Sequence, residues 1–226
     1  MSVILYVHGM GGGADSRIPG YLKPRLSPCG AEVVVRTYEF NPEAASAQIG
    51  KWVEELKPDL IIGESMGANY AARIGSVPRL FVSPALGAPR AMTVLRTLVL
   101  IPGMGRLLGR LFPRKEGERQ EVCFGRESLS GFKALCDDGT VVRSGKVRAF
   151  FGRRDHYRRW GIVSIRKWTR LFGRSTYATY DGTHYMEEPF IESMLIPEIL
   201  SILDESPQDI DQLVVLDKET VVSEDR

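Results

Sequence analysis

Residues 59–67 read Asp59-Leu60-Ile61-Ile62-Gly63-Glu64-Ser65-Met66-Gly67, an apolar run that ends in the pattern Gly-x-Ser-x-Gly. The apolar run predicts a buried β-strand over 59–63, and the residues from 66 to 75 predict a helix. A serine between a strand and a helix, with glycine two residues away on either side, is typical of a sharp turn where larger neighbours would collide. We therefore expect the hydroxyl of Ser65 to be exposed as a nucleophile.

Short β-branched runs alternate with helical patterns on both sides of this stretch. The predicted strands occupy 3–7, 32–38, 59–63, 79–83, 147–152 and 175–180, and the predicted helices 42–56, 66–75, 160–172 and 190–203. Nearly continuous apolar strands with helices between them indicate an α/β fold, in which a mostly parallel central sheet has helices on both faces. In such sheets, functional sites lie at the carboxyl ends of the strands.

The alternation stops between the fourth and fifth predicted strands. From about 85 to 145 the chain has an apolar and basic stretch followed by a charged one, and we expect a cap insertion over the strand ends. The alternating Leu and Arg residues of this insertion would also suit a helix on a membrane surface. We favour packing over the site, and we expect a single α/β domain over 1–204 followed by an acidic C-terminal tail over 205–226.

Length and charge fit a single catalytic domain. The 226 residues carry a formal net charge of +2, which disfavours nucleic acid or an anionic membrane as the principal partner. The charge is unevenly distributed, with 20 Lys and Arg against 7 Asp and Glu over 85–175, and 8 acidic against 2 basic residues over 204–226. We interpret the tail as a solvated segment, with contact to the basic middle as the alternative.

Cysteine usage and apolar runs bear on the compartment. The three cysteines are scattered and form no C-x-x-C pair, which favours a reducing cytoplasm. The first apolar run, 3–7, lacks the basic leader of a signal peptide. The longest apolar run, 94–101, is far below the roughly 20 residues that a membrane span needs. We expect a cytoplasmic protein with no integral membrane span and with peripheral membrane contact as an alternative; the sequence makes no prediction of oligomeric state.

A second glycine-rich stretch, Val7-His8-Gly9-Met10-Gly11-Gly12-Gly13, directly follows the first predicted strand. Glycines there let the backbone approach a substrate closely. Acyl transfer needs two N–H donors aimed at the developing oxyanion. We predict that the amides of Met66 and Met10 supply them, with Gly11 as the alternative to Met10. A phosphate-binding loop is the competing interpretation, but neither common nucleotide-binding glycine pattern is completed.

The remaining binding residues are predicted from their places beside these motifs. We expect Gly9, Gly11 and His156 to contact the substrate, and we expect His8 to brace the glycine-rich turn by hydrogen bonds. His156 adjoins the predicted acid and lies in the wrong loop for a base, so a site-wall or surface position is its alternative.

Only three histidines are available as a general base, and His184 is the best placed of them. It lies in Asp181-Gly182-Thr183-His184-Tyr185, after the last predicted strand and before the C-terminal helix. The acid that orients it should follow the preceding strand, where Asp155 comes after a glycine. Asp181, three residues before His184, is the alternative acid. With Asp155, the triad has the chain order Ser, Asp, His.

Together these segments resemble the α/β-hydrolases, particularly the small YqiA-like bacterial esterases. The resemblance rests on five segments: Ile4 to Gly13, Ile61 to Ala71, Val82-Ser83-Pro84-Ala85, Gly152 to Asp155, and Gly182-Thr183-His184. It covers roughly residues 3–203 in layout, while the basic cap and the acidic tail exceed the compact pattern of that group.

The resemblance implies an α/β-hydrolase fold and an esterase or acyl hydrolase without cofactor or metal, with Ser65, Asp155 and His184 as the triad. We expect hydrolysis of small carboxylic esters or thioesters through an acyl-enzyme. A lipase or phospholipid acyl hydrolase and an amidase or peptidase are alternative enzymes. A non-catalytic binding module on the same scaffold is the alternative of another class.

Overall fold

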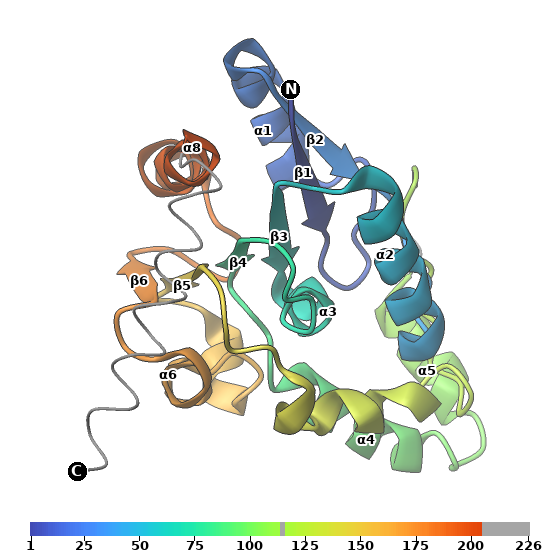
Figure 1. Ribbon diagram of the computed structural model, residues 1–226. Coiled ribbons are helices and arrows are strands. Elements are labelled where there is room, and N and C mark those ends of the chain that lie inside the picture. Colours follow the sequence, from blue (N-terminus) through green and yellow to red (C-terminus); the bar gives the residue numbers. More distant parts are fainter. Residues whose placement is uncertain (114–115, 205–226) are drawn as a thin grey trace.

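The computed structural model describes residues 1–113 and 116–204; the acidic tail predicted over 205–226 lies outside them. One six-stranded sheet, with the order β2-β1-β3-β4-β5-β6, runs through the centre (Figure 1). All five pairings are parallel. The strands are β1 (Ser2–Val7), β2 (Ala31–Val35), β3 (Leu60–Glu64), β4 (Arg79–Val82), β5 (Val147–Gly152) and β6 (Tyr177–Tyr180).

Helices cover both faces of the sheet, as predicted. They are α1 (Arg17–Leu26), α2 (Pro42–Leu56), α3 (Ala68–Ala71), α4 (Ala88–Leu98), α5 (Met104–Leu111), α6 (Ile165–Phe172), α7 (Glu188–Phe190) and α8 (Ile196–Asp204). Leu22 of α1 and Ile199 of α8 belong to one buried cluster, whereas Ile49 of α2, Ala71 of α3 and Trp168 of α6 belong to the other. The two clusters contain alternate residues of the central strands, because successive strand side chains point to opposite faces.

The predicted strands are confirmed, and most differences concern their ends. β2 ends at Val35 rather than Tyr38, because Tyr38 turns into the core and donates its hydroxyl to the carbonyl of His8 at 2.6 Å. The helix α2 begins at Pro42 as predicted, since Asn41 caps it with two side-chain hydrogen bonds. The helix α1 was not predicted, because prolines within it mask its helical pattern.

Two helices are shorter than predicted. The helix after Ser65 ends at Ala71, well before residue 75, and it begins with a 3-10 turn over Ser65–Gly67. The helix α6 begins at Ile165 rather than 160, because a separate 3-10 turn over His156–Trp160 precedes it.

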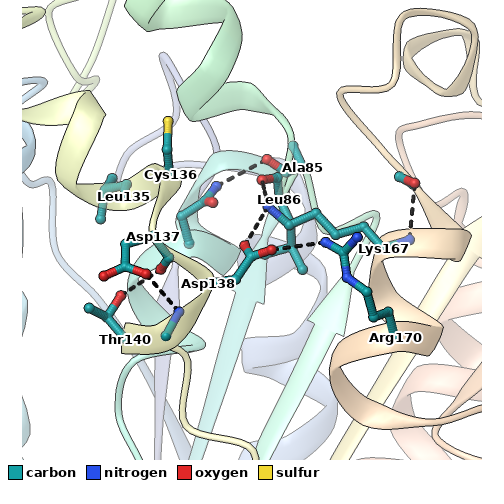
Figure 2. Close-up of polar contacts among 12 residues, drawn as sticks. Ala85, Leu86, Leu135, Cys136, Asp137, Asp138, Thr140, Lys167 and Arg170 are labelled. Atoms are coloured by element: carbon teal, nitrogen blue, oxygen red, sulfur yellow. Dashed lines mark hydrogen bonds and ion pairs between the residues drawn. The ribbon is translucent and has the colours of Figure 1, made fainter.

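The insertion between β4 and β5 is anchored to the sheet domain near its C-terminal end (Figure 2). Asp138 pairs with Lys167 Nζ at 2.8 Å and with Arg170 Nη2 at 2.9 Å, both on α6. Lys167 also donates to the carbonyl of Leu86, just after β4, at 3.0 Å. One lysine therefore ties the insertion to both α6 and the loop that follows β4.

A second anchor comes from Arg73, which follows α3. It donates to the carbonyls of Leu135 at 2.8 Å and Asp137 at 3.1 Å, and to the Thr140 hydroxyl at 2.8 Å. Arg73 itself is bound to the carbonyl of Asn69 at 2.6 Å. Within residues 1–113 and 116–204, no helix combines the length and the apolar character that crossing a bilayer requires.

Candidate active site

Strand register brings the predicted site segments together. Val7 pairs with Gly63, so the glycine-rich turn after β1 emerges beside the Ser65 turn after β3. Gly152 pairs with Tyr180, so the loops carrying Asp155 and His184 also emerge side by side. Parallel strands end at one edge, which lets residues far apart in sequence meet there.

Ser65 occupies a strained turn of the predicted kind. Its φ is +49°, in the left-handed region that ordinary side chains avoid. A Cβ on Gly67 would lie 2.2 Å from the carbonyl oxygen of Val7, and a Cβ on Gly63 would lie 2.9 Å from the Cα of Ala68. Both glycines of the motif are thus required by backbone packing. We call residues 63–67 the elbow.

The elbow is also tied to the loop that follows β4. The amide of Ala85 donates to the carbonyl of Ser65 at 2.9 Å. Asn69 is buried and donates its side-chain amide to the carbonyls of Met66 at 3.1 Å and Ala85 at 3.0 Å. These bonds hold the strained turn between two neighbouring strand ends.

Ser65, His184 and Asp155 form a continuous chain of hydrogen bonds. His184 Nδ1 lies 2.7 Å from Asp155 Oδ2, and His184 Nε2 lies 2.9 Å from Ser65 Oγ. Both His184 and Asp155 are 4% exposed. A carboxylate only accepts, so Nδ1 carries the proton and Nε2 is left as the acceptor for the Ser65 hydroxyl. That is the arrangement a general base needs.

Asp155 has its second oxygen occupied as well, because Oδ1 accepts from the amide of Tyr157 at 2.8 Å. The absence of a side chain at Gly152 lets the loop that carries His184 pack against the end of β5. A Cβ on Gly152 would lie 2.0 Å from the carbonyl oxygen of Thr183. The alternative acid, Asp181, instead has a side chain that is 72% exposed and pairs with Arg154 Nε at 3.3 Å.

The loop before His184 is held by residues that sequence reasoning missed. Glu187 Oε1 accepts from the Thr183 amide at 3.2 Å and from the Thr183 hydroxyl at 3.0 Å. Tyr180 donates its hydroxyl to the carbonyl of Thr183 at 3.2 Å, and burial raises the pKa of Tyr180 to about 12. The sequence feature that could have predicted this contact is the four-residue spacing from Thr183 to Glu187, which suits a closed turn.

The glycine-rich turn, residues 9–13, lies against the elbow. A Cβ on Gly9 would come within 3.1 Å of the Ser65 Cβ. The amide of Gly11, our alternative oxyanion donor, already donates to Gln120 Oε1 at 3.1 Å. Within the described residues, no acceptor is found for the amide of Met10. Among the turn amides, the arrangement favours Met10 over Gly11 as a donor to substrate.

Gln120 was not predicted, although it binds the turn at two points and Tyr38 at a third. Besides accepting from Gly11, it donates its side-chain amide to the carbonyl of Tyr38 at 3.1 Å. Its own backbone amide donates to the carbonyl of Gly12 at 2.7 Å. Gln120 is 4% exposed and stands 109 residues from Gly11, so no local pattern links the two.

His8 lies beneath the turn and is fully buried. Its ring stacks on Tyr38, with centroids 4.3 Å apart, and its Nδ1 lies 2.7 Å from the carbonyl of Gly9. Burial, with a smaller contribution from Arg119, lowers the pKa of His8 from 6.5 to about 4 against the opposing bond to Gly9. His8 is therefore neutral near pH 7, and its Nδ1–H donates to the Gly9 carbonyl.

A cavity of about 560 Å³ opens at Ser65. The elbow and the glycine-rich turn form part of its wall, with His184 at one side. Its apolar wall includes Met92 of α4, Leu111 of α5, Phe112, Val122 and Ile162. The insertion thus supplies much of the cavity wall.

The predicted binding residues lie in different places. Gly9 and Gly11 line the cavity, and so do Met10 and Met66. His156 is exposed and lies outside the cavity wall, because the 3-10 turn that begins after Asp155 directs successive side chains apart.

Tyr157 lines the cavity where His156 was expected. Its ring centroid is 4.6 Å from that of His184, whereas the His156 ring is 6.4 Å away. Burial, followed by the neighbouring Tyr185, raises the pKa of Tyr157, which keeps its phenol neutral. Tyr157, rather than His156, therefore lies at the cavity beside His184.

The arginines beside Asp155 do not line the cavity. Arg154 pairs with Asp181, and Arg158 donates to the carbonyl of Arg153 at 3.1 Å; neither lines the cavity. The arginines that do are Arg17 and Arg119. In the described part of the chain, no cluster of three His, Cys, Asp or Glu side chains has the spacing of a metal site.

Several solved structures share this architecture. Est1E from Butyrivibrio proteoclasticus, solved with ferulic acid bound, is 16% identical with a TM-score of 0.62, over 91% of this chain and 90% of that one. A variant of tomato methylketone synthase I complexed with beta-ketoheptanoate is 11% identical with a TM-score of 0.56, over 90% and 98%. An extracellular α/β-hydrolase from a Paenibacillus species is 9% identical with a TM-score of 0.51, over 88% and 98%.

No protein-family model matches this sequence, and no curated protein is detectably similar to it. At identities this low, structural similarity shows the fold and leaves the activity open to proposal. The resemblance to the YqiA-like esterases is not tested by these comparisons and stays a prediction. What the structural comparisons do show is the α/β-hydrolase fold.

Proposed function

We propose, on the premise that the chain has the α/β-hydrolase fold, that it is a serine hydrolase that cleaves carboxylic ester or thioester bonds. The observation that carries the proposal is the unbroken hydrogen-bond chain from Asp155 through His184 to Ser65, at the wall of a largely apolar cavity. Nucleophile, base and orienting acid in this geometry are the parts that acyl transfer requires.

In the proposed first half-reaction, Ser65 Oγ attacks the acyl carbon while its proton passes to His184 Nε2. The bond from the acyl carbon to the leaving oxygen or sulfur then breaks, and His184 returns the proton to the leaving group. The acyl group stays on Ser65. In the second half-reaction, water attacks the acyl carbon, gives a proton to His184, and Ser65 recovers it as the carboxylic acid leaves.

The amides of Met66 and Met10 are the proposed donors to the oxyanion formed in both halves. Two observations support them: Met66 directly follows Ser65, and the Met10 amide has no acceptor within the described residues, whereas that of Gly11 is occupied. Asp155 is proposed to fix the tautomer of His184 and to stabilise its imidazolium form. The proposed cycle uses side chains, amides and water, with no cofactor or metal.

A small acyl compound is the substrate class that the cavity favours. Its walls bring apolar side chains of the insertion close to Ser65, which suits an acyl chain. An amide would follow the same steps, so an amidase or peptidase differs only in the leaving group. A cytoplasmic location is also proposed, supported by three cysteines that form no disulfide.

A fluorophosphonate probe tests the proposal, because it reacts with an activated serine and needs no knowledge of the substrate. We expect rapid labelling of the native chain at Ser65 and none of Ser65→Ala. Ser193→Ala is the matched control. Ser193 is exposed, its hydroxyl donates to the carbonyl of Pro189 at 2.6 Å, and the variant should label like the native protein. Failure to label beside a reactive control hydrolase would indicate a binding module instead.

The identity of the acid is tested by two aspartate variants. Asp155→Asn should lower kcat by about 10³- to 10⁴-fold on p-nitrophenyl esters, because the amide favours the wrong tautomer of His184. Asp181→Asn should change kcat little, because Asp181 is exposed and pairs with Arg154. The reverse pattern would move the acid to Asp181. Matching p-nitroanilides, measured in parallel, separate ester from amide specificity.

A further inference from the structure

The segment from α4 to α5 exposes an unusual number of large apolar side chains. Ten large hydrophobic residues are exposed in the described part of the chain, and seven of them lie between residues 94 and 112. Those seven are Val94, Leu98, Leu100, Ile101, Leu107, Leu111 and Phe112, with exposures between 43% and 65%. We call them the apolar cap surface. Clustered apolar exposure of this kind marks a site of interaction.

The residues of the apolar cap surface are separate from those with which α4 and α5 pack against the core. On α5, Leu108 packs against the core, whereas Leu107 and Leu111 are one turn apart on an exposed row. On α4, Met92 is buried, while Val94 and Leu98 form a similar exposed row. Each helix therefore has an inner contact with the domain and a separate outer apolar row without a partner among the described residues.

Charge identifies the kind of partner. From residue 85 to residue 113 the sequence has four arginines and neither Asp nor Glu. Arg106 and Arg110 are one turn apart on α5, adjacent to the row of Leu107 and Leu111, and Arg90 precedes Val94 by one turn on α4. Apolar side chains bordered by arginines, with no acidic residue among them, complement a lipid surface with anionic headgroups.

The apolar cap surface continues into the cavity. Leu111 and Phe112 are exposed at 65% and 44%, and both also line the cavity that contains Ser65. The other end of the insertion is fixed by Asp138 on Lys167 and Arg170 (Figure 2). Leu111 and Phe112 thus connect the apolar cap surface with the cavity that contains Ser65.

We propose that the apolar cap surface docks on an anionic lipid bilayer, and that acyl lipids reach Ser65 past Leu111 and Phe112. Docking is independent of the proposed function, whereas the use of lipids as substrate rests on it. Arginines can keep their guanidinium groups at the headgroups while the leucines enter the acyl region. The same cavity would then receive an acyl chain directly from the bilayer.

Vesicle flotation of the full chain tests the docking. We expect binding to vesicles of phosphatidylcholine mixed with phosphatidylglycerol to exceed binding to phosphatidylcholine alone by about tenfold or more, because each basic residue adds attraction to an anionic surface. The preference should fall as salt is raised. No flotation with either vesicle would overturn the proposal, and so would equal flotation with both.

Variants locate the surface. Ile101→Ser with Leu107→Ser should lower vesicle binding by about tenfold or more, while the apolar control Ile101→Leu with Leu107→Met should retain it. Neither residue lines the cavity. Arg106→Glu with Arg110→Glu should abolish the preference for anionic vesicles. Lys23→Glu with Arg174→Glu makes the same charge change at exposed positions elsewhere and should leave the preference intact.

Thermal unfolding of every variant checks that it folds. Sedimentation over a range of concentrations tests the main competing occupant, a second copy of this chain. One outcome would overturn docking on lipid. The native chain would be a dimer that does not float with vesicles, and the Ile101→Ser, Leu107→Ser variant would be a monomer. Ser65→Ala should float like the native chain; if it floats but native protein never reacts with a fluorophosphonate, the docking stands and the proposed hydrolase function fails.

Discussion

The elbow and the glycine-rich turn are both glycine-containing turns after parallel strands, yet they are held in different ways. The elbow is fixed by its immediate neighbours: Gly63 packs on the helix that follows, and Gly67 packs on the end of the adjacent strand. The glycine-rich turn is fixed from a distance, because Gln120 reaches it from the insertion. Nearby residues thus determine the position of Ser65, whereas a distant segment shapes the turn that carries the proposed oxyanion donors.

This difference has a functional consequence. The insertion lines the cavity, and through Gln120 it also fixes the amide of Gly11. A change in the insertion can therefore alter both the cavity wall and the glycine-rich turn while the elbow stays intact. Substitutions that act on one turn and leave the other unchanged test this separation.

The largest effect is expected at Gly67. An added Cβ would lie 2.2 Å from the carbonyl oxygen of Val7 and 2.5 Å from that of His8. Both are backbone atoms, so relieving the clash requires the strand end to move. Gly67→Ala should lower the free energy of unfolding by at least about 3 kcal/mol. Urea unfolding measures the change.

Gly50→Ala is the matched control for Gly67→Ala. Gly50 lies within α2, and a Cβ added there would have no heavy atom within 4 Å, so alanine should stabilise by about 0.5–1 kcal/mol. A stable, fluorophosphonate-reactive Gly67→Ala protein would show that the elbow is not fixed by local packing.

The second effect is expected at Gln120. Gln120→Ala leaves the buried amide of Gly11 and the carbonyl of Tyr38 without partners and frees the glycine-rich turn to shift. We expect kcat on p-nitrophenyl esters to fall by about ten- to a hundredfold with little change in KM, because a displaced oxyanion donor is felt mainly in the transition state. Steady-state kinetics measures both constants.

Gln48→Ala is its control, because half-buried Gln48 makes a similar pair of bonds and does not line the cavity. It accepts from the amide of Glu39 at 2.9 Å and donates to the carboxylate of Glu39 at 3.1 Å. Its loss should leave kcat unchanged. If Gln120→Ala also kept the native kcat while losing stability, the remote clamp would serve folding and have no part in catalysis.

The same division explains what the sequence could predict. The strands and the elbow follow from local patterns, since Ile61 and Ile62 before the glycine identify both the strand and its turn. Asp155 and His184 were predicted from the order of the triad residues along the sequence. In the structure, His184 lies within hydrogen-bonding distance of both Asp155 and Ser65. Gln120 escaped prediction because its partners lie far away in the sequence.

Two further differences between prediction and structure arise at turns, whose geometry cannot be predicted from the spacing of apolar residues. The 3-10 turn after Asp155 exposes His156 and places the next residue, Tyr157, at the cavity. Tyr38 leaves β2 early because its hydroxyl is drawn to the carbonyl of His8. In both cases a tertiary hydrogen bond or turn overrides a local propensity.

The third effect concerns pH and the glycine-rich turn. The pKa of His8 is about 4 in the folded chain, against 6.5 normally. Between these values the unfolded chain binds a proton that the folded chain does not, so stability is full above about pH 6.5 and falls as the pH drops. The loss between pH 7 and pH 5 should be about 2 kcal/mol. Urea unfolding at both pH values measures it.

His8→Asn should remove this part of the pH dependence, because asparagine does not titrate and its side-chain amide can still donate toward Gly9. His156→Asn is the matched control, since His156 is exposed, and it should keep the native slope. An unchanged slope in His8→Asn would mean that groups other than His8 cause the acid sensitivity of the turn.

The smallest effect is expected at Gly11, and it separates backbone conformation from packing. Gly11 has a φ of +69°, but only Val122 Cγ2, at 3.7 Å, would contact an added Cβ. Gly11→Ala should therefore cost only about 1 kcal/mol of stability, the penalty for an ordinary residue in the left-handed region. Its amide stays in place for Gln120, so kcat should fall by less than about threefold. Urea unfolding and steady-state kinetics on one preparation provide both values. A loss as large as that of Gly67→Ala would mean that the glycine-rich turn is as tightly packed as the elbow, and the contrast between a locally fixed and a remotely fixed turn would no longer hold.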